Sequence, residues 1–190
     1  LLLVPTIGTY RTFLAISALM LLVALGLLWR VSGWKAAVAL GWMPLVIAIL
    51  AVIGVEGFDK ATPGLVYETE SSYNYIQVLQ EGEFRYLRLN EGQGIHSIYH
   101  PTQLLYAGPW EQVLAAPYFN PAPVDPAGLR SLAIVGLAAG TTARQASVAY
   151  PAAQIDGYEI DPKIVEVGRK YFGMDLPNLN VIVQDGRYGL

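Results

Sequence analysis

The sequence contains no cysteine, which excludes disulfide bonds, thiolate catalysis and cysteine-ligated zinc within its 190 residues. Histidine is almost as scarce, since His96 and His100 are the only two. They flank a predicted strand, and a proline follows the second, so their spacing does not bring both rings onto adjacent turns of a helix. We therefore expect no metal site.

Charge is also scarce. Charged residues make up 14% of the chain, whereas about 25% is usual in soluble domains. The deficit is local, because residues 12–29 and 36–55 contain no charge at all. Each run can cross a hydrocarbon core of about 30 Å as a helix, and neither ends in the cleavage site of a signal peptide. We predict transmembrane helices within residues 1–57, with the apolar residues 1–9 as the tail of an earlier helix.

A basic patch is missing from the remainder of the chain. Residues 61–190 hold 8 basic and 13 acidic residues, a net charge of −5, without a run of lysine or arginine. This balance argues against nucleic acid as a partner. An acidic surface suits a polycationic substrate, although such a surface is more often a solubility device.

Two further regions follow the apolar runs. Residues 65–120 predict a β-meander, because segments rich in Tyr, Val, Ile and Leu alternate with turn residues. Its expected strands are 66–79, 83–89 and 94–99, followed by a helix over 110–116 and a proline-rich linker over 120–126. Residues 128–190 then alternate strand and helix, the pattern of a parallel sheet. The expected strands are 131–135, 154–160 and 179–183, and the expected helices are 141–149 and 162–172, the latter with Asp161 as N-cap.

The most informative residues follow these strands. Gly136 and Gly140 allow a sharp turn into a helix and a close approach of the backbone to a ligand. Glu159 ends the next strand about 20 residues after this turn, the spacing at which an acid accepts hydrogen bonds from ribose hydroxyls. Asp185 ends the third strand and can accept from an adenine amino group. Because ligands bind beyond the carboxyl ends of parallel strands, we predict a nucleoside site there.

The same residues resemble the spermidine synthase (polyamine aminopropyltransferase) family, in particular its membrane-fused bacterial members. That family has a glycine-rich turn, a Glu-Ile-Asp strand end and an Asp-Gly strand end, matched here by residues 136–140, 159–161 and 185–186. Residues 72–78 and 89–92 resemble its upstream strand and turn. The resemblance covers about two thirds of the chain and implies a small β-domain before a partial methyltransferase-like Rossmann domain.

The resemblance implies a function and a set of site residues. The donor would be decarboxylated S-adenosylmethionine or S-adenosylmethionine, and the acceptor a polyamine. Asn74 replaces a glutamine of the family, and His96 stands roughly where the family has a substrate-contacting glutamine. The tyrosines of the meander are either ordinary half-buried strand residues or the lining of an amine pocket. The expected donor contacts are Gly136, Gly140, Thr141, Glu159, Asp185 and Gly186, and the expected substrate contacts are Asn74, His96 and Tyr106.

Departures from the family pattern leave alternatives open. Ala139 stands near the position at which family members carry the Asp that pairs with the donor's amine. The family's catalytic Asp lies on a further strand, after the position of Asp185, and this sequence does not contain that strand. No catalytic base is assigned, we expect this span to be inactive alone, and we interpret it as a fragment of a longer protein. The alternatives are a methyltransferase that uses S-adenosylmethionine and a non-catalytic subunit of a membrane complex.

The cationic residues beside the two apolar runs are evenly divided, so charge gives no membrane orientation. Because the nucleoside donor is made in the cytoplasm, we expect a multi-pass protein of the cell inner membrane with a cytoplasmic globular domain.

Overall fold

The computed structural model describes residues 3–53, 62–90, 92, 94–121, 123 and 125–189. The chain divides into two compact units, Leu1–Thr62 and Pro63–Leu190, which are treated separately below. Most of the predicted exit from the membrane, residues 56–64, lies outside the described residues.

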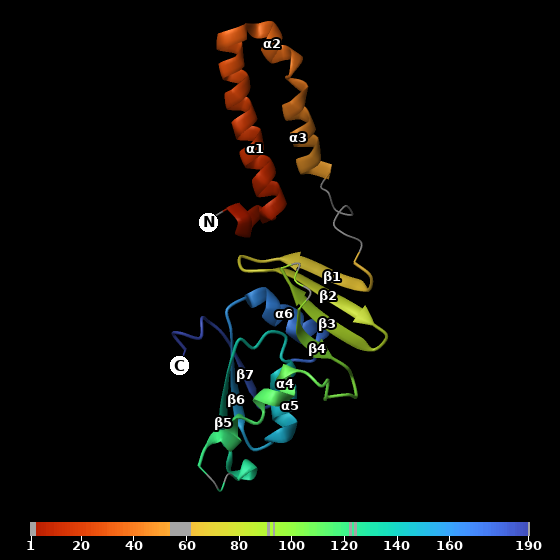
Figure 1. Ribbon diagram of the computed structural model, residues 1–190, viewed down its shortest axis with the longest axis vertical. Helices are drawn as coiled ribbons and strands as arrows, with labels where there is room; N and C mark the ends of the chain where they lie inside the picture. Colours follow the sequence, from red (N-terminus) through yellow and green to blue (C-terminus); the bar gives the residue numbers. More distant parts are fainter. Residues whose placement is uncertain are drawn as a thin grey trace. The chain divides into compact units, whose positions relative to one another are not determined.

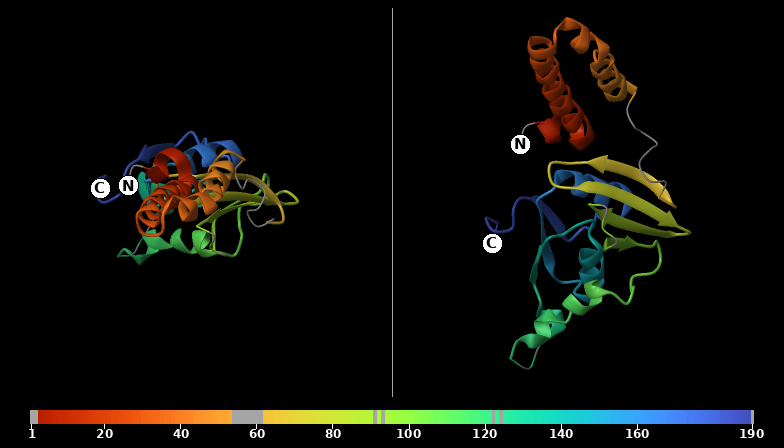
Figure 2. Two further views of the ribbon diagram at one scale, coloured as in Figure 1. Left: turned by 90° about the horizontal axis from the view of Figure 1, so that it is seen from above. Right: turned by 45° about the horizontal axis from the view of Figure 1, so that its top comes forward.

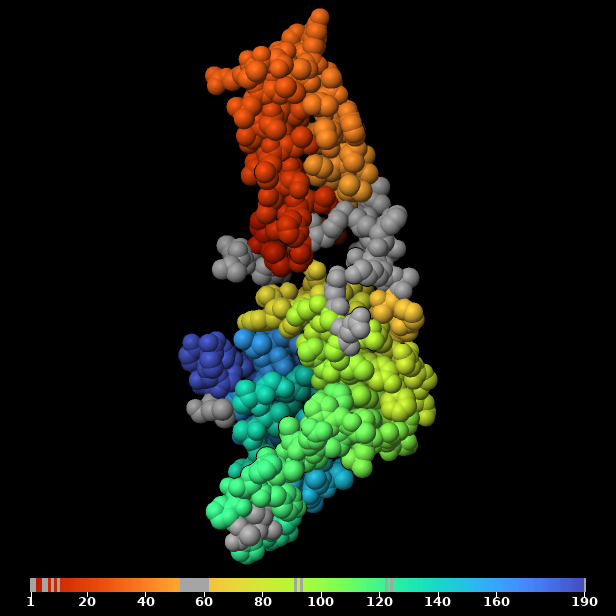
Figure 3. Space-filling view, viewed as in Figure 1, coloured from red at the N-terminus to blue at the C-terminus, as the bar shows by residue number. Residues whose placement is uncertain are grey.

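The first unit is a helical hairpin (Figures 1 and 3). Helix α1 spans Leu3–Ser32 and lies beside α2 (Trp34–Ala39) and α3 (Trp42–Ile53). The prediction of a separate helix over residues 1–9 is wrong for residues 3–9, which are the first turns of α1. Pro5 is compatible with this continuity because it lies in the first turn, where no intrahelical partner is lost. Gly33, with a φ of +83°, ends the helix.

The second apolar run does not form one helix. The Leu40 and Gly41 N–H groups donate to Ala37 O and Val38 O, three residues back, and these tighter bonds end α2. Pro44 lies in the first turn of α3, where its missing N–H costs little. The predicted continuous helix over 36–55 is therefore wrong at residues 40–41, and residues 54 and 55 lie outside the described range.

Two segments of this hairpin, Arg11–Ser32 and Trp34–Ala51, are long and apolar enough to cross a membrane by length and composition. Large apolar side chains point outward along both. Phe13, Leu19 and Met20 are each more than 60% exposed. Of the first segment 6% is buried, and of the second segment none is buried. In water such exposure would be unfavourable by roughly 1.5–3 kcal/mol for each large side chain.

The second unit begins with an antiparallel sheet of strand order β1-β2-β3-β4. The strands are β1 (Leu65–Glu70), β2 (Tyr75–Glu81), β3 (Phe84–Leu89) and β4 (Ile95–Tyr99). The meander has four strands because the predicted strand 66–79 is interrupted by a turn. In this turn the Ser71 hydroxyl accepts from the N–H groups of Tyr73 and Asn74, which offers the backbone an alternative to pairing.

Short helices connect this sheet to the next. The predicted helix 110–116 is divided into α4 (Pro109–Val113) and the 3-10 turn η1 (Ala116–Phe119), with Pro117 in the first turn of the latter. A second 3-10 turn, η2 (Pro126–Gly128), begins where Asp125 accepts a hydrogen bond from the Ala127 N–H.

A parallel sheet of order β5-β6-β7 completes the unit. Its strands are β5 (Ser131–Val135), β6 (Gln154–Glu159) and β7 (Leu179–Val183), joined by α5 (Thr141–Ala149) and α6 (Pro162–Tyr171). The bounds of β5, α5 and β7 are those predicted. Asp161 caps α6 as predicted, because its side chain accepts from the Lys163 N–H.

The meander sheet shares one core with α6 and with the turn after β5. Ile76, Val78 and Leu87 of the meander are fully buried and pack in one cluster with Ala139, Ile164, Val167 and Phe172. Figures 1 and 2 show α6 lying against the meander sheet. The meander and the Rossmann-like segment are thus one compact body, which fixes the meander turns relative to the parallel strands.

Candidate functional site

The turn after β5 has an unusual backbone. Gly136, Ala138 and Gly140 all have positive φ, at +78°, +50° and +89°. The N–H groups of Gly136 and Leu137 both donate to Tyr158 O, at 3.0 and 2.9 Å, which fixes the start of the turn to β6. Only glycine adopts such angles without strain, so the two glycines predicted to shape this turn do so. Ala138 occupies the left-handed region at a cost of roughly 1–2 kcal/mol.

Glu159 lies directly against this glycine turn. Its Oε2 accepts from the Ala138 N–H at 2.8 Å, and its Oε1 accepts from the Asp161 N–H at 3.1 Å. The residue is 7% exposed. A carboxylate offers about four acceptor positions, so each oxygen retains capacity for one further donor. The structure therefore brings together the glycine turn and the acid that the sequence predicted to lie near it.

Asp185 follows β7, and the adjoining Gln184 N–H donates to Glu159 O at 3.0 Å. Its carboxylate is paired with the Arg187 guanidinium at 2.5 Å and also accepts from the Arg187 N–H. The hydrogen bonds from the Arg187 side chain and backbone, opposed by slight desolvation, lower the pKa of Asp185 to about 2. Asp185 is thus an ionised acceptor at neutral pH, and Arg187 already occupies part of its acceptor capacity.

Gly186 has a steric role. A Cβ at this position would lie 2.5 Å from Cγ1 of Val135, the last residue of β5. The chain after β7 therefore passes close to the end of β5, and only glycine permits this approach.

Thr141 does not present its hydroxyl to a ligand. Its Oγ1 accepts from the Ile98 N–H at 2.8 Å and donates to Ile98 O at 2.9 Å, and the residue is 3% exposed. Any contact of Thr141 with a cofactor would therefore be made by its main chain, and its place among the donor contacts stays a prediction. The hydroxyl instead joins β4 to the start of α5. Nearby, the buried Ser97 hydroxyl accepts from the Ala139 N–H at 3.0 Å.

Of the three predicted substrate residues, Asn74 alone is joined to the strand ends by hydrogen bonds among the described residues. Its Nδ2 donates to Asp161 Oδ2 at 3.0 Å. His96 is exposed on β4. Tyr106 packs edge-on against Phe84 and Trp110, and its hydroxyl donates to Gln103 O. Burial raises the pKa of the Tyr106 phenol above 10. These contacts place Tyr106 in the loop after β4 and not beside Glu159.

Sequence reasoning missed two donors to Asp161. The Ser71 hydroxyl and the Asn74 amide both reach its Oδ2, at 2.5 and 3.0 Å, across 90 and 87 residues. The sequence identifies Asp161 as a helix cap, and the Ser71–Asn74 spacing is compatible with a local turn. Only the docking of the meander onto α6 brings these residues together.

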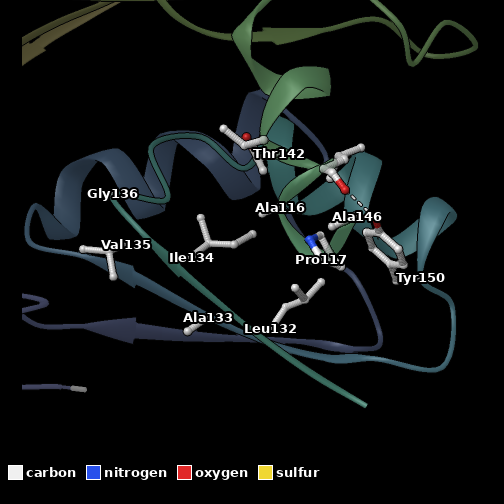
Figure 4. Close-up of a pocket in the computed structure, with 12 residues that line it drawn as sticks. Ala116, Pro117, Leu132, Ala133, Ile134, Val135, Gly136, Thr142, Ala146 and Tyr150 are labelled. Atoms are coloured by element: carbon white, nitrogen blue, oxygen red, sulfur yellow. Dashed lines mark hydrogen bonds between the residues drawn. The ribbon is translucent and has the colours of Figure 1, made fainter. Parts of the chain in front are cut away.

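A cavity of about 390 Å³ lies beside β5 (Figure 4). Leu132 and Ile134 form one wall. Ala146 of α5 and Tyr150, the residue after this helix, form another, and Ala116 and Pro117 close a third side. Tyr150 donates its hydroxyl to Leu114 O. Gly136 is the one predicted site residue that lines it. The lining of the cavity is mainly apolar and includes neither Glu159 nor Asp185.

In the described part of the chain, no group of three or more His, Asp or Glu side chains is arranged to hold a metal ion. The polar groups at the strand ends are acceptors: the Glu159 carboxylate, which is bonded to the glycine-containing turn, and the Asp185 carboxylate, which follows β7. Such an arrangement suits the hydroxyl and amino groups of a nucleoside.

Two proteins of known class are similar to the chain in sequence. The chain is 36% identical over 143 residues to a probable polyamine aminopropyl transferase of Bifidobacterium longum, covering 74% of this chain and 30% of that protein. It is 26% identical over 147 residues to a polyamine aminopropyltransferase of Vibrio vulnificus, covering 75% of this chain and 46% of that protein. The chain thus spans less than half the length of either relative. No family model matches it.

The fold has a solved counterpart. The crystal structure of a probable spermidine synthase from Corynebacterium glutamicum superposes with a TM-score of 0.51 at 19% identity, covering 67% of this chain and 46% of that one. At this identity the likeness concerns the fold, and it agrees with the sequence relationship to the two aminopropyltransferases. Over about three quarters of its length the chain is thus similar in sequence to polyamine aminopropyltransferases, the spermidine synthase family, and it shares their fold.

Proposed function

We propose that the carboxyl edge of β5, β6 and β7 binds the adenosine part of an S-adenosylmethionine-type donor, in a membrane-anchored protein that transfers an aminopropyl group to a polyamine. The observation that carries this proposal is the position of Glu159, whose carboxylate lies against the glycine turn through Ala138 N–H. Each Glu159 oxygen can accept one ribose hydroxyl. Asp185 would accept from the adenine amino group.

The transfer itself sets a second requirement. A polyamine nitrogen attacks the carbon next to the sulfonium, the carbon–sulfur bond breaks with its electron pair moving to sulfur, and methylthioadenosine leaves. The nitrogen must lose a proton, and an alkylammonium has a pKa near that of lysine, about 10.4. Asp185, with its pKa lowered to about 2 by Arg187, is too weak a base for this step. We therefore assign Asp185 to binding and assign no residue of this span as the base.

The recognition of the donor's amine group distinguishes a second candidate function from the first. Ala139 is fully buried within the shared core, so no carboxylate at this position faces a donor amine. This absence favours a methyltransferase that uses S-adenosylmethionine over aminopropyl transfer, whereas the relationship to the aminopropyltransferases favours the latter. Both enzyme functions require the same nucleoside site, whereas a non-catalytic subunit would not require it.

Membrane anchoring is part of the proposal. The outward-facing apolar side chains of α1 and α3 support it, since a helix with an apolar surface all round is stable in lipid. We place the anchor in the cell inner membrane and the second unit in the cytoplasm, where the donor is made. Further membrane subunits would be compatible partners for the hairpin.

The direct test is calorimetric titration of the detergent-solubilised chain with methylthioadenosine, S-adenosylmethionine and decarboxylated S-adenosylmethionine. We expect binding that Glu159→Gln weakens by about 1–3 kcal/mol, because a charge-assisted acceptor is lost. Glu166→Gln is the matched control, since Glu166 lies on the exposed surface of α6 and pairs with Lys163.

The ranking of the three ligands distinguishes the candidate functions. Preference for the decarboxylated donor supports aminopropyl transfer, and preference for S-adenosylmethionine supports methyl transfer. Absence of binding to all three at millimolar concentration would refute the nucleoside site and leave the non-catalytic subunit.

A further inference from the structure

Asp161 has more hydrogen bonds than its role as a helix cap requires. Its Oδ1 accepts from the Lys163 N–H at 3.0 Å, which is the capping bond of α6. Its Oδ2 accepts from the Ser71 hydroxyl at 2.5 Å and from the Asn74 amide at 3.0 Å. An N-cap needs one acceptor oxygen only. The second oxygen, Oδ2, is not needed for capping and instead holds Ser71 and Asn74. Asp161 is fully buried.

We propose that Asp161, held by Ser71 and Asn74, is a positioning residue that orients the Glu159 carboxylate for the ribose hydroxyls of a nucleoside. The inference rests on the proposed function of the strand edge. The link is the Asp161 backbone N–H, which donates to Glu159 Oε1 at 3.1 Å. Asp161 is thus attached to the meander through its side chain and to the predicted ligand-binding acid through its main chain.

The donors on the meander are themselves fixed. Ser71 Oγ accepts from the Asn74 N–H at 2.9 Å, and Asn74 Oδ1 accepts from the Asn90 Nδ2 at 2.8 Å. Asn90, with a φ of +56°, also accepts from the Tyr75 N–H through its Oδ1. The turn before β2 and the turn after β3 are therefore joined, and together they present Ser71 and Asn74 to Asp161.

This arrangement determines which way the Glu159 carboxylate faces. Glu159 is held from two sides, by the Ala138 N–H and by the Asp161 N–H. With both bonds present, its remaining acceptor positions have one orientation, as recognition of a vicinal diol requires. If Asp161 moves with α6, one bond is lost and the carboxylate can rotate. The meander thereby contributes to ribose recognition without contacting the ribose.

The test is a comparison of two ligands by calorimetry on the detergent-solubilised full chain. Adenosine carries both ribose hydroxyls, and 2′,3′-dideoxyadenosine carries neither. We expect the wild type to prefer adenosine by at least about tenfold, because each hydroxyl makes a hydrogen bond to a charged group. The double variant Ser71→Ala/Asn74→Ala should lower this preference by about threefold or more, with the affinity for dideoxyadenosine little changed.

The chosen variants leave the capping oxygen of Asp161 in place, so α6 retains its N-cap. Circular dichroism melting verifies that they fold. Ser71→Thr keeps the hydroxyl and should retain the wild-type preference, whereas Glu166→Gln should leave both affinities unchanged.

An unchanged preference in the folded double variant would overturn the inference, because Asp161 would then be a cap alone. Equal weakening of both ligands would also overturn it, since that outcome indicates general damage to the site. Failure of the wild type to bind either nucleoside would refute the proposed function and this inference together.

Discussion

At the scale of single residues, the environment of Asp185 separates binding from proton transfer. The Arg187 hydrogen bonds lower its pKa from 3.8 to about 2. A carboxyl group whose pKa is depressed in the folded state stabilises that state above its unfolded pKa, and this stabilisation is lost as the pH falls from about 3.8 to about 2. Nucleoside contacts through Asp185 should accordingly persist in mild acid.

We predict that Arg187→Gln raises the pKa of Asp185 towards 3.8, because its main donor is removed. Carboxyl carbon chemical shifts in an NMR titration provide the measurement. Arg169→Gln is the control, as Arg169 pairs at 3.7 Å with a different carboxylate, that of Asp175. An Asp185 pKa that stays near 2 in Arg187→Gln would mean that another group holds the carboxylate ionised.

The glycine turn allows a second prediction. Gly140→Ala combines a left-handed φ with a steric conflict, since the new Cβ would lie 2.7 Å from Met174 Cγ. Gly82→Ala has a similar φ, of +60°, but no atom within 4 Å. We expect Gly140→Ala to lower the free energy of unfolding by about 1–3 kcal/mol more than Gly82→Ala does. Thermal melting of the two variants gives the comparison, and equal losses would show that Met174 relaxes freely.

The residues at the strand ends also show what a sequence can specify. The positions of Gly136, Gly140 and Glu159 were predictable, because each lies at or just after the end of a strand and the topology brings strand ends together. The partners of Asp161 were not, because Ser71 and Asn74 reach it only after the meander packs on α6 through Ile76, Val78 and Leu87. The bonds of the Thr141 hydroxyl to Ile98 were not predictable for a similar reason, since nothing local indicates them.

At the scale of elements, β4 is joined to the glycine turn by buried polar contacts. The Ser97 hydroxyl, on a residue that is 1% exposed, accepts from the Ala139 N–H. We predict that Ser97→Ala lowers the free energy of unfolding by about 1–3 kcal/mol, because a buried N–H is left without its acceptor. Ser131→Ala, at an exposed position of β5, should change it by less than about 0.5 kcal/mol. Urea denaturation measures both, and equal effects would contradict the role assigned to Ser97.

Elements were predictable to different degrees. The bounds of β5, α5 and β7 follow from apolar runs bounded by glycine, proline or a polar cap, which are local signals. The interruption at residues 40–41 was missed because it lies within a continuous apolar stretch. The interruption at residues 71–74 was missed although these residues are polar, because strand-type residues flank them on both sides. At residues 71–74 the Ser71 hydroxyl accepts backbone N–H groups that a strand would use for pairing. At residues 40–41 the backbone N–H groups bond to carbonyls three residues back, and these bonds end α2.

At the scale of the whole molecule, the two units differ in how their exposed apolar side chains are distributed. In the second unit, α5 and α6 contribute Ala143 and Val165 to a cluster with Ile134 and Val181, so they cover one face of the parallel sheet. Alternate residues of β5 on the opposite face, including Val135, are exposed. In the first unit exposed apolar side chains occur along α1 and α3, and this exposure supports the proposed membrane anchor.

The hairpin supplies the last prediction. Val23 lies near the middle of the Arg11–Ser32 window and is 57% exposed, and we expect the wild-type chain to stay with membranes during carbonate extraction. Val23→Arg should release a large fraction, because an arginine at the centre of a membrane helix opposes insertion by about 2.5–3.5 kcal/mol. Val148→Arg is the matched control, since Val148 is 63% exposed on α5 in the other unit and should not alter extraction. Release of the wild type without detergent would refute the anchor, and equal release of both variants would show that added charge acts elsewhere than at a bilayer.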